Sequence, residues 1–276
     1  LSLSLSFFFV KVRPTKRVIT SQIRFRFRII GMVSLLSIGI VSFIVGIKDA
    51  PRLLGFPFHG IVPWFSSVVI SFTITFSLFL GPASERAIKM WRMRGMLRTI
   101  GGGSSSVTAT IIRYVEFAKV FVLFQTPRTP LVPTRNLIVA PLFEEFVFRS
   151  CMCAILYAGG VSLSDIILFS PLVFGLAHVH HALEAIVRFK QPWKQQILRA
   201  TLQTAYTALF GIFAAFLLIR TGHFVAPFVS HMFCNSMGLP SLEFLFRPDY
   251  DLKDYRKHIA FLFFFGIVLF VFELRF

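Results

Sequence analysis

The chain has 276 residues, of which 55% are hydrophobic and 36 are phenylalanine, and its mean hydropathy is +0.74. This composition excludes a soluble globular domain and predicts an all-α, polytopic membrane protein. The net charge of +17 does not indicate a nucleic-acid partner, because the Lys and Arg residues lie mainly between apolar stretches. There they favour anchoring to the lipid bilayer.

The first 28 residues form a basic segment that opens with LSLSLSFFFV and with Leu1 instead of methionine. We expect this segment to be disordered, a targeting or anchoring element, or an artefact of an incomplete gene model. Residues 29–276 are predicted to form a single transmembrane domain. Its first span is the uncharged stretch 29–47, and a second crossing is predicted near 64–80, after a segment disturbed by proline and glycine.

Five basic residues between positions 86 and 98 precede a run of three glycines and three serines. This pattern predicts a basic cytoplasmic loop with a flexible tip. The next stretch, 107–125, is a weaker span, because Arg113, Glu116 and Lys119 would line one face of a helix. It is expected either to cross against other helices or to lie in the interface.

Further apolar stretches complete the chain, at 137–157, 165–182, 200–219, 225–239 and 259–272. Together they predict about seven to eight transmembrane helices around a membrane-embedded catalytic cavity, with a catalytic core at 136–240. Glycines and prolines near His231 predict a tilted or broken helix there. Strict alternation of eight spans cannot place all the basic segments in the cytoplasm, so the sequence leaves the topology open.

Glu144, Glu145 and Arg149 interrupt the apolar stretch 137–157. A charged side chain at the centre of a spanning helix costs about 2.5 to 3.5 kcal/mol, so such groups are functional candidates. On a helix Glu145 and Arg149 lie four residues apart and can form an ion pair. Glu144 projects about 100° away from Glu145 and is therefore the carboxylate left for chemistry.

Two later apolar stretches carry His178 and the pair His231 and Asn235. The last two are four residues apart, so on a helix both side chains could face one oxyanion. A desolvated glutamate and one histidine could activate a water molecule while the second histidine and the amide stabilise the tetrahedral intermediate. This set of residues indicates amide hydrolysis without a covalent intermediate.

Four sequence blocks resemble the type II CAAX prenyl endopeptidases, a branch of the ABI group of membrane glutamate proteases. They are APLFEEFVFRS at 140–150, FGLAHVHHALE at 174–184, RTGHFVAPFVSH at 220–231 and HMFCNSMGLP at 231–240. The second and fourth blocks are similar to the eukaryotic branch. The resemblance implies a multi-pass enzyme of the endoplasmic reticulum membrane that removes the last three residues of prenylated CAAX proteins.

The same resemblance implies roles for individual residues. Glu144 and His178 would polarise the attacking water, and His231 with Asn235 would form the oxyanion hole. The second acid of the EExxxR block and its arginine would support the site. No cofactor or metal is implied, and the expected partners are farnesylated or geranylgeranylated CAAX proteins such as Ras-type GTPases.

Other mechanisms and functions compete with this interpretation. Glu144, His178, His181 and His231 could bind zinc, although no HExxH motif is present. Cys234 lies three residues after His231 and could act as a nucleophile, but all three cysteines lie in apolar segments and are expected to be packing residues. The intramembrane charges could instead belong to a proton-coupled transporter. A scaffold with a decayed site is the remaining alternative.

Overall fold

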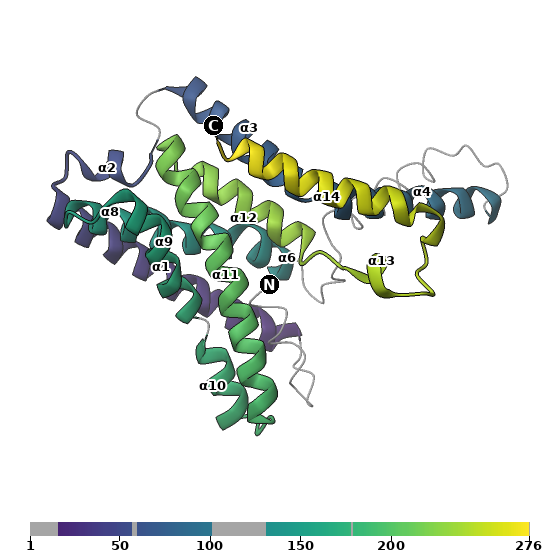
Figure 1. The fold of residues 1–276 in the computed structure, drawn as a ribbon. Helices are drawn as coiled ribbons and strands as arrows, with labels where there is room; N and C mark the ends of the chain where they lie inside the picture. Colours follow the sequence, from purple (N-terminus) through teal and green to yellow (C-terminus); the bar gives the residue numbers. More distant parts are fainter. Residues whose placement is uncertain (1–15, 57–59, 101–130, 178, 276) are drawn as a thin grey trace. The chain divides into compact units, whose positions relative to one another are not determined.

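The computed structural model describes residues 16–56, 60–100, 131–177 and 179–275. Every regular element in these ranges is a helix, which confirms the all-α prediction (Figure 1). The chain forms two compact units, one from Leu1–Ser71 and Thr129–Met232, the other from Phe72–Arg128 and Phe233–Phe276. The predicted span 107–125 lies outside the described residues.

The first unit begins with the long helix α1 (Lys16–Val45) and the short helix α2 (Ala50–Leu53). An unbroken helical run follows from 131 to 158, in which the α-helical segments alternate with two π-helical turns. Its segments are α6 (Leu131–Thr134), η2 (Arg135–Val139), α7 (Ala140–Glu145), η3 (Phe146–Cys151) and α8 (Met152–Ala158). The unit continues with α9 (Leu163–Leu176), α10 (Val179–Val187) and α11 (Trp193–Thr221).

Two helices extend through both units. They are α3 (Ile61–Leu78) and α12 (Val225–Met237). The second unit also contains α4 (Leu80–Ile100), α13 (Glu243–Phe246), the 3₁₀ turn η4 (Lys253–Tyr255) and α14 (Arg256–Glu273).

Four helices of the described chain are long and apolar enough to cross a membrane: Ile23–Val45, Ile61–Leu78, Trp193–Thr221 and Lys253–Glu273. They overlap the predicted spans at 29–47, 64–80, 200–219 and 259–272. The predicted span 165–182 divides between the shorter helices α9 and α10, and 225–239 becomes the thirteen-residue α12. A multi-pass helical membrane protein is therefore confirmed, and the total of seven to eight crossings stays a prediction.

The predicted basic loop at 86–98 is wrong, because these residues belong to α4. The high charge density suggested a loop, yet the segment after Pro82 contains only one glycine before position 101 and is rich in good helix formers. Glu85 and Lys89 form an ion pair of 2.7 Å one turn apart. Ile88 also packs on the apolar core of the second unit.

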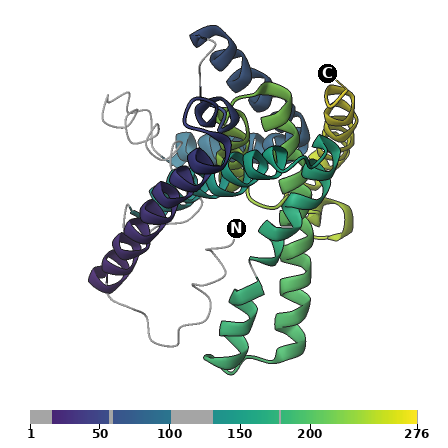
Figure 2. The same ribbon diagram turned by 90° about the vertical axis from the view of Figure 1, so that its left-hand side faces the viewer.

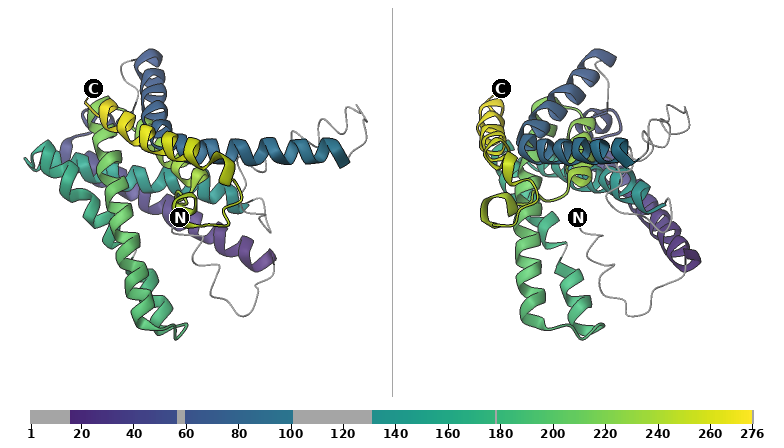
Figure 3. Two further views of the ribbon diagram at one scale, coloured as in Figure 1. Left: turned by 45° about the vertical axis from the view of Figure 1, so that its right-hand side comes forward. Right: turned by 90° about the vertical axis from the view of Figure 1, so that its right-hand side faces the viewer.

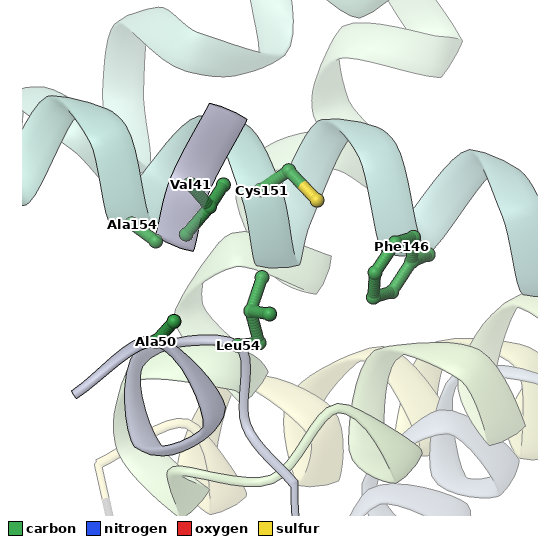
Figure 4. Close-up of a cluster of buried hydrophobic side chains, with 6 residues drawn as sticks. All are labelled: Val41, Ala50, Leu54, Phe146, Cys151 and Ala154. Atoms are coloured by element: carbon green, nitrogen blue, oxygen red, sulfur yellow. The ribbon is translucent and has the colours of Figure 1, made fainter. Parts of the chain in front are cut away.

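A buried cluster in the first unit fixes the π-helical turn η3 against α1 and α2 (Figure 4). Gly46, with a φ of +88°, ends α1 and allows the chain to turn back into α2. The side chains that meet in the cluster are Val41, Ala50, Leu54, Phe146, Cys151 and Ala154. This packing holds the helical run in which the acidic residues lie.

Helices α9 and α11 pack closely along their length (Figure 2). A Cβ added to Gly175 of α9 would lie 3.0 Å from the Thr204 side chain, and one added to Gly211 of α11 would lie 2.6 Å from Cβ of Pro171. Glycine at both positions therefore permits the close approach of the two helices.

In the second unit α4 and α14 lie side by side (Figure 3). The contact depends on Gly81, because a Cβ there would lie 2.7 Å from Cα of Phe263. One apolar cluster of this unit joins Phe244, Tyr250 and Leu252, from the segment between α12 and α14, to Ile259 of α14.

Candidate active site

Glu144 and Glu145 end the segment α7, between the π-helical turns η2 and η3. Such turns insert an extra residue into the helical repeat and are frequent at functional sites. Pro141 follows directly after η2, where the π-helical turn has already interrupted the regular α-helical pattern and the missing N–H of proline fits. The two acids are thus held in a locally irregular helix whose apolar neighbours are packed.

Glu145 and Arg149 form the ion pair that the sequence predicts. Oε2 of Glu145 lies 3.1 Å from Nε of Arg149, and the two side chains are 0% and 2% exposed. The guanidinium carbon lies 4.2 Å from the centroid of the Phe174 ring, within the range of a cation–π contact. Its Nη2 atom lies 3.0 Å from the position that a Cβ on Gly211 would occupy. The guanidinium of Arg149 is therefore held between Phe174 and Gly211, where it pairs with Glu145.

His231 of α12 lies against both glutamates. Its Nδ1 is 2.6 Å from Oε1 of Glu145, and its Nε2 is 3.8 Å from Oε2 of Glu144. The ring of Phe210 covers the imidazole, with 4.9 Å between the ring centroids. The contact between His231 and Glu145 joins residues 86 positions apart.

The ion pair decides which nitrogen of His231 carries a proton. Glu145 is paired with Arg149, so it is a carboxylate and can only accept hydrogen bonds. Nδ1 of His231 is therefore the donor in the 2.6 Å contact. This bond fixes the orientation of the ring and directs Nε2 toward Glu144, as an acid partner does for many functional histidines.

The two carboxylates differ in accessibility. The Glu145 side chain is 0% exposed and both its oxygens face cations or N–H donors, whereas the Glu144 side chain is 27% exposed. The 3.8 Å between Glu144 and Nε2 is too long for a direct hydrogen bond. One water molecule placed beside that line can contact both groups at about 2.8 Å, donating to the carboxylate of Glu144. The arrangement can therefore position a water molecule.

Two predicted catalytic residues remain, His178 and Asn235. His178 lies outside the described residues. Asn235 lies one turn after His231 on α12, in the part of that helix that belongs to the second unit. Among the cysteines, Cys151 and Cys153 are buried as predicted, and Cys234 is half-buried.

The zinc alternative finds no complete ligand set in the part of the chain that the structure describes. No group of three His, Cys, Asp or Glu side chains there could hold a metal ion. His178 lies outside this part, and the side chain of His181 is not described.

Sequence reasoning missed the hydrogen bond between His231 and Glu145, as well as the aromatic rings that enclose the pair. One sequence signal pointed to this hydrogen bond. A histidine in an apolar helix needs a hydrogen-bond partner, and a glutamate that is paired with an arginine, such as Glu145, is a strong acceptor. The sequence alone could not show which acid approaches the ring.

The helices define the class of this protein as a polytopic membrane protein, and its first unit holds a cluster of two carboxylates, an arginine and a histidine. Residues 126–237 match the family model described as type II CAAX prenyl endopeptidase Rce1-like. The chain belongs to this family of CAAX prenyl proteases.

Three relatives illustrate the similarity. The chain is 34% identical to CAAX prenyl protease 2 of Arabidopsis thaliana over 224 residues, which cover 79% of this chain and 68% of that protein. It is 35% identical to CAAX prenyl protease 2 of Homo sapiens over 193 residues, 69% of this chain and 51% of the relative. It is 36% identical to the probable CAAX prenyl protease 2 of Schizosaccharomyces pombe over 127 residues, 46% of this chain and 47% of the relative. The chain thus spans about two thirds of the plant relative and about half of the other two. No solved structure matches the chain.

Proposed function

We propose that this chain is an endopeptidase of the endoplasmic reticulum membrane that removes the terminal aaX tripeptide from prenylated CAAX proteins, Ras-type GTPases among them. One observation carries the proposal: the accessible carboxylate of Glu144 lies beside an imidazole that the buried pair of Glu145 and Arg149 holds in place. Family membership supports the substrate class.

Glu144 is the general base in this proposal. Its exposure leaves an oxygen open to water, whereas both oxygens of Glu145 are engaged. A carboxylate next to an imidazole can accept the proton of a water molecule as that water attacks a carbonyl carbon. By resemblance to the family, His178 would bind the same water.

His231 serves as an oxyanion donor when its ring carries both protons. Nδ1–H then remains bound to Glu145, and Nε2–H is open toward the side of Glu144. In that state two carboxylates face one guanidinium and one imidazolium, so the four side chains are neutral together.

By resemblance to the family, Asn235 completes the proposed oxyanion hole. Its position one turn after His231 puts both residues on the same side of α12. Each donor strengthens its hydrogen bond as negative charge develops on the carbonyl oxygen. The substrate carbonyl would therefore be polarised before water attacks.

The proposed reaction balances without a cofactor. Water gives one proton to Glu144, and its oxygen bonds to the carbonyl carbon of the prenylated cysteine itself. When the tetrahedral intermediate collapses, the C–N bond breaks and Glu144 returns the proton to the leaving amine. The products are a new carboxylate on the prenylcysteine and a free tripeptide.

A membrane-embedded hydrolase suits this substrate class. An isoprenoid chain partitions into lipid, at about 0.8 kcal/mol for each buried CH₂ group, so the adjacent peptide bond is delivered to the membrane surface. The four helices apolar enough to span a membrane place the enzyme in the same phase.

Membranes that contain the full chain test the proposal. We expect release of the tripeptide from a farnesylated CAAX peptide and no release from its unprenylated twin, with mass spectrometry locating the cleaved bond. Equal cleavage of both peptides would contradict the prenyl specificity. A bond cleaved elsewhere in the peptide would contradict the CAAX assignment.

A further inference from the structure

Arg86 of α4 binds the C-terminal end of α12, the helix that carries His231 and Asn235. Its Nη1 donates to the carbonyl oxygen of Ser236 at 3.1 Å and lies 3.2 Å from the sulfur of Met237. Its Nη2 donates to the carbonyl oxygen of Met237. Arg86 and both partners belong to the second unit, so this contact is internal to it.

The end of a helix exposes carbonyl groups that have no intrahelical partner. In α12 several of these groups find partners nearby. The N–H of Gly238, which has a φ of +66°, donates to the carbonyl of Cys234 at 2.8 Å. One residue earlier in the helix, Oγ of Ser236 donates to the carbonyl of Phe233 at 2.7 Å. Arg86 then supplies donors for the last two carbonyls, and its positive charge faces the negative end of the helix dipole.

The side chains on either side of Asn235 are fixed as well. Phe233 and Met237 are buried against Phe79. The ring of Phe233 meets the rings of Phe72 and Phe79 edge-on, at centroid distances of 5.2 and 5.5 Å. Aromatic packing therefore holds one side of the last turn, and Arg86 holds its carbonyl end.

We propose that Arg86 is a positioning residue that fixes the last turn of α12 and thereby the direction of the Asn235 amide. The inference rests on the proposed function, in which that amide contacts the oxyanion. Arg86 itself touches no reacting atom. Its two-pronged guanidinium suits the task because it reaches two successive carbonyls at once, which the single ammonium of a lysine does less well.

Arg92 provides a matched control on the same helix. Its Nη1 donates to the carbonyl of Asp251 at 2.9 Å and its Nη2 lies 3.3 Å from Asp254, so it binds the segment after α12 and not α12 itself. We expect Arg86→Met to lower kcat by between about ten- and a hundredfold, as a small misplacement of a catalytic group does. KM should stay within about twofold, Arg86→Lys should recover part of kcat, and Arg92→Met should leave both constants unchanged.

A double-mutant cycle separates positioning from general destabilisation. If Arg86 acts through Asn235, then Arg86→Met should cost little more in a chain that already carries Asn235→Ala. If the fold-losses in kcat of the two single variants multiply in the double variant, the two residues act independently and the inference is overturned. Full kcat in Asn235→Ala alone would instead refute the proposed oxyanion hole, and the positioning role with it.

Hydrogen exchange gives a readout that needs no turnover. In the full-length protein, the amides of residues 233–240 should exchange about tenfold faster in Arg86→Met, and at the original rate in Arg92→Met. Unchanged exchange in Arg86→Met would overturn the inference. If the wild-type chain cleaves no CAAX peptide but the exchange rate rises as expected, the proposed function fails and the helix contact stands.

Discussion

The imidazole of His231 donates from Nδ1 to the carboxylate of Glu145 across 2.6 Å, in a site where Glu145 also binds Arg149. This hydrogen bond determines how the other side chains of the candidate site are arranged. It gives the buried acid a structural and electrostatic role, directs Nε2 toward Glu144, and leaves Glu144 as the carboxylate that water can reach.

Changes at Glu145 should separate charge from hydrogen bonding. In Glu145→Gln the amide oxygen can still accept from Nδ1 of His231, but the buried Arg149 loses its counter-charge, so we expect kcat to fall about a hundredfold and stability to fall as well. In Glu145→Ala the buried Arg149 loses its partner, which should cost about 3 to 5 kcal/mol of stability. Turnover and thermal unfolding of the two variants measure the difference. Parent-like stability in both variants would contradict the buried ion pair.

Gly211→Ala should damage the site through packing. The new Cβ would lie 2.6 Å from Cβ of Pro171 and 3.0 Å from Nη2 of Arg149, so the two helices or the guanidinium must shift. We expect a loss of about 1 to 3 kcal/mol of stability, as overpacking usually costs. Gly39→Ala in α1 is the control, because nothing lies within 4 Å of its added Cβ. Denaturation of both variants provides the test, and equal midpoints would count against the packing described.

Cys234→Ser should retain activity. In the proposed mechanism no thiol attacks the substrate, and serine differs from cysteine by one atom, so kcat should stay within about threefold of the parent value. A farnesylated peptide assay on purified protein measures this. Loss of turnover with normal folding would revive the cysteine mechanism.

Chelators should leave turnover unchanged. The proposed base and oxyanion donors are side chains, so prolonged incubation with a strong zinc chelator should have no effect on the initial rate. If the chelator abolishes turnover and added Zn²⁺ restores it, the result would instead support the metal alternative, with His178 as one of the zinc ligands.

The sequence predicts local relationships best. The ion pair of Glu145 and Arg149 follows from a spacing of four residues within one helix, and it forms as expected. The contact of His231 with Glu145 depends on how α12 packs against the helical run 131–158, and no local rule encodes that packing. The sequence therefore could not show that the second acid also contacts His231.

The fold shows the same division. The length and hydropathy of the apolar stretches were sufficient to predict the four helices that could span a membrane. The helix α4 was mistaken for a loop, because its basic residues suggested solvent, whereas Arg86 and Arg92 bind carbonyl groups of neighbouring segments. Gly238 also ends α12 two residues before the predicted end of that span.

The most direct test of the central claim is the rate of tripeptide release from a farnesylated CAAX peptide by Glu144→Gln, compared with Glu184→Gln. Glu184 is an exposed acid of α10 that pairs with Arg188, so its change controls for the loss of a charge. We predict that Glu144→Gln loses at least about a thousandfold in kcat and stays folded, while Glu184→Gln keeps the parent rate. Full activity in a folded Glu144→Gln protein would contradict the claim that this carboxylate activates the attacking water.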